Sequence, residues 1–230
     1  MPSLSTFSFP IGRVALISDA VWIQLARHVS LKTISLHGHL YSVDVHAILE
    51  HVPSPFQSLR SLEFTTWPSA INRLMPYLPR LQTIILTVIP LDPGVISLIA
   101  ETCKDLRCLD LENFGFNDTD LDDCQIERLA RLTPRLRTLN IDTRYTCLTA
   151  QALQSLAKNC HELQRCRLFG SFDILEFGTS GNILFPYLRF LSISHVEKYE
   201  VSSIEAHTAV LRYHMPLLES WEFGPPFHEL

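Results

Sequence analysis

The chain has 230 residues, of which 47% are hydrophobic and 19% charged, and its formal net charge is −5 at pH 7. This composition is typical of a folded protein with a large core, and it excludes an intrinsically disordered chain. The negative charge argues against a nucleic-acid partner, because such partners are held mainly by lysine and arginine contacts to phosphate. Six cysteines are too few for a small scaffold stapled by disulfides.

The N-terminal sequence MPSLSTFSFPIGR contains no basic segment followed by an apolar run, so no secretory signal is predicted. The most apolar stretch, residues 81–91, has 11 residues, whereas a membrane-spanning helix needs about 20. We therefore expect no membrane partner and a cytoplasmic or nuclear location.

A six-residue template recurs along the chain: Leu-x-x-Leu-x-Leu, with Ile, Phe, Cys or Trp also allowed at the two later positions. Its nine copies start at Leu4, Leu31, Leu59, Leu81, Leu106, Leu136, Leu163, Leu188 and Leu218. Successive copies are 22 to 30 residues apart. Pro2, Pro79, Pro134, Pro186 and Pro216 precede their leucine by two positions, and Cys103 and Cys160 precede theirs by three. Nine matches in a narrow range of spacing, with a second column in register, indicate a structural repeat.

Each template segment predicts a short strand, and helical segments lie between the templates. In residues 19–29, Val21, Leu25 and Val29 recur at helical spacing, and in residues 43–52, Val45, Ile48 and Val52 do the same. These residues are expected to form the buried faces of the first two helices.

The later helices carry recognisable start signals. Asp92 precedes Pro93, as at the start of a helix, and Thr149 opens a segment with apolar residues at helical spacing. The other helical segments are a short one at 69–78 and longer ones at 121–132 and 204–215, while residues 170–182 contain three glycines and no convincing helix.

A strand followed by a helix cannot bury its apolar face alone, so the units are expected to stack. Stacked strands then pair in parallel, with helices as the crossovers. Strands are spaced about 4.8 Å apart and packed helices about 8–10 Å apart, so the stack must bend. The expected fold class is α/β: a solenoid with a parallel inner sheet and outer helices, bent into a horseshoe, forming one domain of about nine repeats over residues 1–230.

Residues 103–132, CKDLRCLDLENFGFNDTDLDDCQIERLARL, and 160–170, CHELQRCRLFG, resemble the leucine-rich repeat family, in particular its cysteine-containing kind with repeats of about 26–28 residues. The resemblance covers nearly the whole chain. It implies Asn or Cys at the ninth position of each repeat, where the side chain bonds adjacent loops. The chain departs from that pattern, with His39, Trp67, Ile89, Phe114, Arg144, Ser171 and Val196 at this position.

Repeats of this kind look like those of fungal and animal F-box proteins, the substrate receptors of SCF-type ubiquitin ligases. That resemblance implies a substrate-recognition role, and an F-box ahead of the repeats that docks on the ligase adaptor. No LPxE start with a trailing tryptophan motif precedes Leu4, so we expect a fragment or a truncated gene product. The SCF adaptor is a partner only if an F-box exists upstream. The alternative is a general repeat adaptor or inhibitor unconnected with ubiquitin.

No catalytic, metal or cofactor site is predicted, so we expect a binding protein and not an enzyme. The HGH histidines at 37–39 and the scattered cysteines lack the spacing of a zinc site. The acidic segment 117–123 lacks the glycine and glutamate that a calcium loop needs. The GTSG segment at 178–181 lacks the spacing of a nucleophile elbow.

The predicted binding site is the inner sheet face, because alternate strand residues must point away from the core. One outward column reads Ser8, Ser35, Glu63, Ile85, Asp110, Asn140, Arg167, Ser192 and Glu222. The next reads Pro10, His37, Thr65, Thr87, Glu112, Asp142, Phe169, Ser194 and Gly224. The predicted partner-binding residues are Glu63, Asp110, Glu112, Asn140, Asp142, Arg167 and Phe169.

This acidic surface, followed by Arg167 and Phe169, predicts a protein partner that presents a basic segment with an apolar tip. The column directly after the repeat leucine is largely basic, with Lys32, Arg60, Arg107, Arg137 and Arg189. Ordinary solvation of an exposed sheet face would produce both patterns without a partner, and it remains the alternative interpretation.

Overall fold

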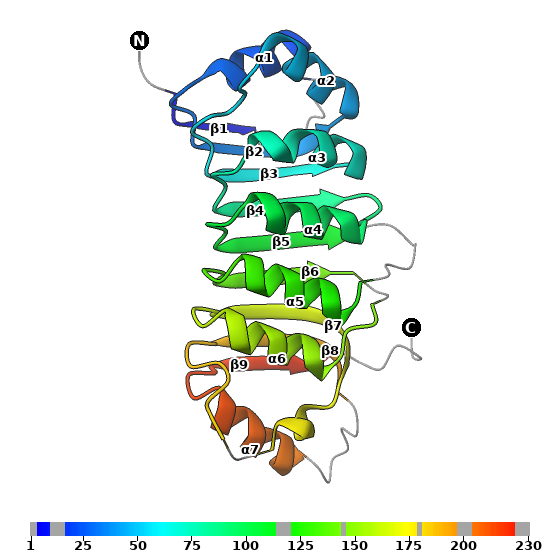
Figure 1. Ribbon diagram of the computed structural model, residues 1–230, viewed down its shortest axis with the longest axis vertical. Helices are drawn as coiled ribbons and strands as arrows, with labels where there is room; N and C mark the ends of the chain where they lie inside the picture. The colour runs from blue at the N-terminus through cyan, green and yellow to red at the C-terminus, as the bar shows by residue number, and fades with distance from the viewer. Residues whose placement is uncertain are drawn as a thin grey trace. The chain divides into compact units, whose positions relative to one another are not determined.

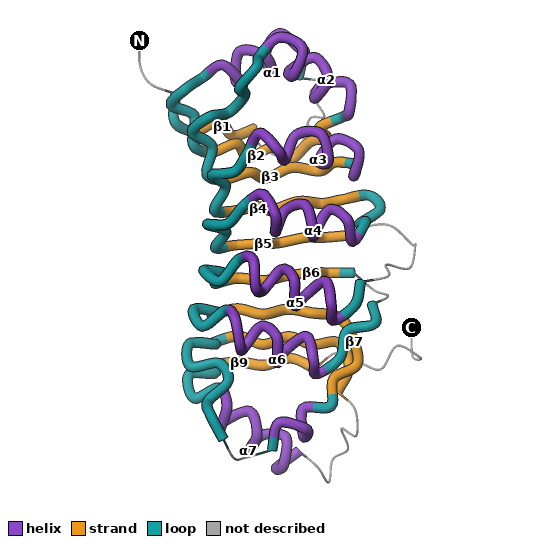
Figure 2. Tube along the Cα trace, viewed as in Figure 1, coloured by secondary structure: helices purple, strands orange, loops and turns teal. Residues whose placement is uncertain are grey.

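The computed structural model describes residues 4–9, 17–113, 121–143, 146–178, 181–196 and 204–223. The chain forms two compact units, residues 1–116 (unit 1) and 117–230 (unit 2). Parallel strands alternate with helical segments in both units (Figures 1 and 2).

In the described residues of unit 1, five strands pair in parallel in chain order. They are β1 (Thr6–Phe9), β2 (Thr33–Leu40), β3 (Ser61–Thr66), β4 (Thr83–Val88) and β5 (Cys108–Asn113). The helices between them are α1 (Asp19–Arg27), α2 (Ser42–His51), α3 (Pro68–Leu74) with the short 3-10 helix η1 (Met75–Tyr77), and α4 (Pro93–Thr102). Neighbouring helices pack against one another along the unit.

Unit 2 contains four parallel strands: β6 (Thr138–Asp142), β7 (Arg165–Phe172), β8 (Phe190–Val196) and β9 (Ser220–Phe223). Its helices are α5 (Asp123–Leu132), α6 (Ala150–Asn159) and α7 (Ile204–His214). In the glycine-rich segment 170–182, the described residues after β7 form the 3-10 helix η2 (Ile174–Phe177) and no α-helix, as the sequence predicts.

Every strand begins two residues after a repeat leucine, which confirms the predicted register. The backbone N–H of the residue after that leucine donates to the carbonyl of the same position one repeat earlier. These pairs are Lys32–Ser5, Arg60–Lys32, Gln82–Arg60 and Arg107–Gln82 in unit 1, and Gln164–Arg137, Arg189–Gln164 and Glu219–Arg189 in unit 2, at 2.8–2.9 Å. Each unit therefore has the predicted fold, an α/β leucine-rich repeat solenoid. The horseshoe bend and the single domain over residues 1–230 remain predictions.

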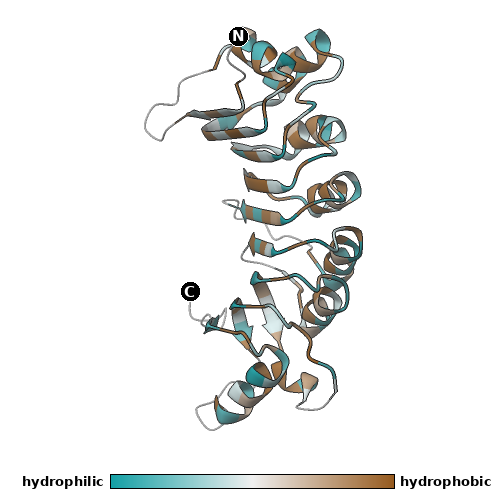
Figure 3. Ribbon diagram, turned by 90° about the vertical axis from the view of Figure 1, so that its left-hand side faces the viewer, coloured by the Kyte–Doolittle hydropathy of each residue, from teal (hydrophilic) through white to brown (hydrophobic). Residues whose placement is uncertain are grey.

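The repeat leucines form the core between each sheet and its helices. Leu31, Leu59, Leu81, Leu106, Leu136, Leu163 and Leu188 each expose 1% or less of their surface. Hydrophobic and hydrophilic residues alternate along the strands and around the helices (Figure 3), as expected for elements with one buried face.

Cys103 and Cys160 end helices α4 and α6, which explains their fixed place before the repeat leucine. Their backbone N–H groups donate to Ile99 and Leu156 at 2.8 and 2.7 Å. The Cys103 thiol lies 3.5 Å from the Leu78 carbonyl of the preceding repeat. Burial raises the pKa of both thiols to about 12, so they stay protonated as weak hydrogen-bond donors.

The predicted helix starts after Asp92 and Thr149 are confirmed, since each side chain accepts a hydrogen bond from the first helical turn. Asp122 forms a reciprocal pair with Gln125 at the start of α5, with bonds of 2.7 and 3.0 Å. The preceding acidic residues 117–120 lie outside the described residues.

The predicted buried face of the first helix is partly wrong. Leu25 is buried, but Val21 and Val29 are 42% and 68% exposed, while Trp22 and Ala26 are buried instead. Helix α1 ends at Arg27, so Val29 lies beyond the helix, and the large Trp22 ring turns the buried face by one residue. The predicted face of the second helix, formed by Val45, Ile48 and Val52, is confirmed.

Side chains at the eighth position of two repeats bond adjacent loops. The Asn113 amide oxygen accepts from the backbone N–H of Leu91 at 3.2 Å. The buried Thr66 hydroxyl donates to the Leu40 carbonyl at 2.9 Å. In these two repeats the bonding residue therefore precedes the family's ninth position by one.

Within the described ranges, no helix is long and apolar enough to cross a membrane. No group of three or more His, Cys, Asp or Glu side chains in those ranges is arranged to hold a metal ion.

Replacing Leu109 of β5 with alanine should lower the free energy of unfolding by about 2–5 kcal/mol, because its fully buried side chain would leave a cavity. Leu139 has the same repeat position in β6, and the same loss is expected there. The exposed neighbour Arg107, replaced with alanine, should change stability by less than about 0.5 kcal/mol. Chemical denaturation measures all three, and a loss below about 0.5 kcal/mol at Leu109 would contradict the register.

Thiol labelling of the native chain should modify Cys124 and Cys147, which are exposed, and spare Cys103, Cys160 and Cys166, which are buried. Burial raises the pKa of each of these three thiols to about 12, so little thiolate forms at mildly alkaline pH. Peptide mass spectrometry reads the result, and denaturant should expose all five to the reagent. Rapid labelling of native Cys166 would show that β7 is misplaced.

Candidate protein-interaction faces

Helices α1 to α4 lie on one side of the unit 1 sheet, which leaves the other side as its open face (Figure 1). Strand pairing arranges the side chains of this face in rows. One row contains Ser35, Glu63, Ile85 and Asp110, and the next contains His39, Thr65, Thr87 and Glu112. All are half-buried or exposed, whereas the residues between the two rows in β3, β4 and β5 (Phe64, Leu86 and Leu111) are buried.

The open face of unit 1 is acidic. Glu63, Asp110 and Glu112 project from β3 and β5, and the sequences of β2 to β5 contain no lysine or arginine. The Ser35 hydroxyl donates to Glu63 Oε2 at 2.6 Å. Two strand spacings separate Glu63 from Asp110 by about 10 Å. That distance is near the Debye length of about 8 Å at physiological salt, so the carboxylates act partly together on an approaching charge.

The sequence predicted His37 in the second row, and this is wrong: His39 pairs with Thr65. Strand β2 has three residues between Ser35 and His39, where β3 has one between Glu63 and Thr65. The two extra residues form a bulge, which moves the following side chains along the strand. Because two residues were added, inward and outward positions still alternate, and Leu40 is buried.

Three aromatic rings lie together at the edge of this face, where β2 and β3 end. The Tyr41 and Trp67 rings are stacked, with centroids 5.0 Å apart and 21° between their planes. The His39 ring lies 5.8 and 5.4 Å from them, tilted by 43° and 39°. We call His39, Tyr41 and Trp67 the aromatic cluster.

The sequence did not predict this cluster. His39 and Trp67 are departures from the family's ninth position, and no sequence pattern marks Tyr41. Aromatic residues in that column in two successive repeats were the available signal. The bulge that brings Tyr41 beside Trp67 left no recognisable sequence pattern.

The open face of unit 2 carries both signs of charge. Strand pairing aligns Asn140, Arg167, Ser192 and Glu222 in one row. Arg167 Nη2 lies 3.4 Å from Asp142 Oδ2, with the two side chains 43% and 36% exposed. Its guanidinium carbon lies 5.7 Å from the Phe169 ring centroid. An exposed pair of this kind contributes up to about 1 kcal/mol, and it offsets the charge of Asp142.

The sequence predicted Ser194 to face outward, and this is wrong because of a bulge in β7. The pairing of β7 with β8 shifts between Leu168 and Ser171, and the buried Ser194 side chain bonds the backbone of the bulge. Its hydroxyl accepts from the Gly170 N–H at 2.8 Å and donates to the Gly170 carbonyl at 3.0 Å. Beside it, the Thr146 hydroxyl donates to the Phe169 carbonyl. These bonds fix the backbone that carries Phe169.

The seven predicted partner-binding residues thus fall into two groups. Glu63, Asp110 and Glu112 belong to the open face of unit 1, and Asn140, Asp142, Arg167 and Phe169 belong to that of unit 2. Pro10 and Gly224, from the predicted second column, lie outside the described residues. The role of all seven residues in binding stays a prediction.

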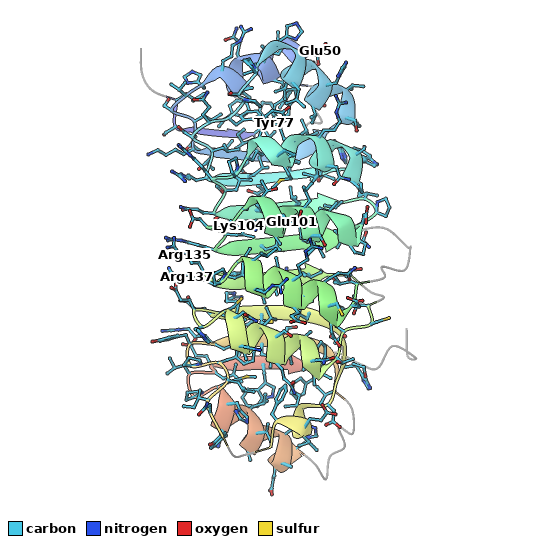
Figure 4. The ribbon with its side chains drawn as sticks, viewed as in Figure 1. Glu50, Tyr77, Glu101, Lys104, Arg135 and Arg137 are labelled. Carbon is cyan, nitrogen blue, oxygen red and sulfur yellow. The ribbon has the colours of Figure 1, made fainter. Side chains whose placement is uncertain are left out.

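Two members of the basic column link successive repeats. Arg137 Nη2 lies 2.7 Å from Glu162 Oε2, and Arg189 Nη1 lies 2.9 Å from Glu219 Oε1. Figure 4 labels Arg137 at the edge where the strands of unit 2 begin. Arg137 and Arg189 of the basic column therefore form ion pairs between successive repeats, a role that needs no binding partner.

No protein-family model matches the chain. No curated protein matches it either. Among solved structures, a similar chain belongs to the crystal structure of the Rad7 and Elc1 complex in yeast. It is 16% identical, with a TM-score of 0.34, and the match covers 87% of this chain and 71% of that one. A likeness of this size transfers no partner and no activity.

Replacing Gly170 with alanine should destabilise the chain by about 1–3 kcal/mol, since overpacking forces the backbone to move. The added carbon would lie 2.4 Å from the Leu148 carbonyl oxygen. Gly38, in the β2 bulge, has nothing within 4 Å of that position and is the matched control. Gly38→Ala should be neutral or stabilising by up to about 1 kcal/mol. Equal denaturation midpoints for the two variants would show that the loop at Leu148 does not press on β7.

Proposed function

We propose that this chain is a protein-interaction scaffold whose open sheet faces bind a protein partner. The observation that carries the proposal is the open face of unit 1, where three carboxylates, on strands without lysine or arginine, share one side of a hydrogen-bonded sheet with an aromatic cluster. Solvation of a sheet requires polar side chains of any kind. It does not require strand charges of one sign beside a cluster of aromatic rings, which are enriched at the centres of protein interfaces.

The partner that complements unit 1 presents a basic segment. Complementary charge speeds association and rejects acidic competitors, while the aromatic and apolar groups supply contact area. Unit 2 offers a different chemistry, a guanidinium held between Asp142 and Phe169. The same partner need not contact both faces in the same way.

Within this role, we propose that the chain is the substrate-recognition region of an F-box protein of an SCF-type ubiquitin ligase. The support is the resemblance of the repeats, with cysteine or proline just before the repeat leucine, to those of F-box proteins. The second candidate is a general leucine-rich repeat adaptor or inhibitor. Genomic sequence upstream of Met1 separates the two, because an in-frame F-box favours the first and its absence favours the second.

Binding is proposed over catalysis because the described open faces are rows of strand side chains. Catalysis needs acids, bases or nucleophiles that converge on one reacting atom. In unit 1, the strand pairing spreads the carboxylates along and across the sheet instead.

Charge reversal tests the proposal. Glu112→Lys should leave the unfolding curve nearly unchanged, because Glu112 is exposed. It should reduce capture of the partner by at least about tenfold, because like charges then face each other. Proximity labelling with the full-length gene product identifies the partner, and affinity capture with the wild-type chain and each variant measures the loss.

The matched control is Glu101→Lys, an equal charge change on the exposed surface of α4 (Figure 4). It should leave capture intact. Asp142→Lys tests the open face of unit 2 in the same way. If Glu112→Lys and Asp142→Lys both capture as well as the wild type, the open faces are not the binding surface.

A further inference from the structure

The aromatic cluster breaks a local rule in two successive repeats. Tyr41 and Trp67 occupy the residue just before helices α2 and α3, a position that favours Ser, Thr, Asp or Asn because a short side-chain oxygen bonds the first helical turn. Helices α4, α5 and α6 follow the rule with Asp92, Asp122 and Thr149. Breaks of a local rule occur mainly at functional or strained sites, which makes the two rings a candidate binding site.

The rings are not needed to fill the core. Leu40 and Thr66, the residues just before Tyr41 and Trp67, are 1% and 0% exposed and point to the helical side. The two rings take the opposite, half-buried positions, and His39 beside them is exposed. The backbone that carries Tyr41 is fixed, since its N–H donates to Asp44 Oδ2 at 2.8 Å. The cluster is therefore partly accessible to solvent, through His39 and the half-buried Tyr41 and Trp67, and its backbone at Tyr41 is held by a hydrogen bond.

An exposed aromatic face attracts cations, because the ring quadrupole places negative charge above and below its plane. The surroundings on the open face add to this attraction. Glu63 of β3 lies four residues before Trp67, which follows the end of that strand with extended backbone angles, so about 13 Å separates them. Asp110 and Glu112 follow on β5. On the helical side, Arg73 of α3 is hydrogen-bonded to His46 at 2.9 Å, and His46 pairs with Glu50.

We propose that the aromatic cluster is the anchoring site for a guanidinium or ammonium side chain of the partner. The inference rests on the proposed function and adds the chemistry of recognition to it. In an extended segment lying along β3, cationic residues four positions apart would reach Glu63 and the Tyr41–Trp67 pair together, because both chains rise by about 3.3 Å per residue. The segment recognised by unit 1 thus carries two cations at this spacing.

The test uses a synthetic glycine- and serine-rich peptide with two arginines four residues apart, together with a twin in which citrulline replaces both arginines. Citrulline keeps the size and planarity of the side chain and removes its charge. The isotope-labelled full chain is titrated with each peptide by NMR, and the indole N–H of Trp67 is assigned by its loss in Trp67→Tyr. The arginine peptide should shift this signal, and the citrulline peptide should bind about 2- to 30-fold more weakly.

Trp67→Leu should weaken binding of the arginine peptide by about 2- to 30-fold, while Trp67→Tyr, which keeps an aromatic face, should retain most of it. Tyr41→Leu is a second variant at the same site and should act like Trp67→Leu. Trp221→Leu is the matched control, because Trp221 is 38% exposed on β9 of unit 2, and it should leave binding unchanged. Denaturation curves verify that each variant is folded.

Three results would overturn the inference: no response of the Trp67 signal to the arginine peptide, equal binding of the citrulline twin, or binding unaffected by Trp67→Leu and Tyr41→Leu. Equal binding of the twin would identify the cluster as an apolar contact. The variant Glu112→Lys distinguishes a failure of this inference from a failure of the proposed function. If Glu112→Lys weakens binding of the arginine peptide while Trp67→Leu does not, the acidic face binds the peptide and only the anchoring role of the aromatic cluster is rejected.

Discussion

The constraint on which each unit depends is the backbone ladder where successive strands start. At seven strand starts the N–H that follows a repeat leucine bonds the same position of the preceding repeat, and seven of the nine repeat leucines are buried beneath the helices. A shift of one residue would expose that leucine and bury a charged neighbour, so the register is strongly determined. The positions of the strand side chains on both open faces depend on this ladder.

Because the ladder fixes the residue at which each strand starts, differences in strand pairing between repeats occur where the strands end. Strands β2 and β7 both have bulges in their second half, and both bulges lie beside aromatic residues of the open faces. In β7 the bulge is held by Ser194 and by the loop at Leu148. In β2 it brings Tyr41 next to Trp67. Irregular strand ends thus position the chemically distinctive side chains, while regular strand starts maintain the fold.

The two open faces differ because their charges are arranged differently. In unit 1 the carboxylates of Glu63, Asp110 and Glu112 stand on strands whose sequences contain no lysine or arginine. In unit 2 the Asp142 carboxylate is partly neutralised by Arg167, which also lies near the Phe169 ring. The proposed basic segment of the partner is therefore assigned to unit 1, and a partner surface of mixed charge is proposed for unit 2.

The sequence by itself determined the strand starts, the parallel order within each unit and the buried leucines, because one short apolar template recurs at a nearly constant spacing. It also identified the acidic positions Glu63, Asp110 and Glu112, since these follow from strict alternation within regular strands. It did not determine the pairing of His39 with Thr65, the burial of Ser194 or the stacking of Tyr41 on Trp67. Each of these depends on a bulge, and a bulge forms where neighbouring strands and loops of the folded chain compete for the same backbone groups, so only the tertiary structure decided them.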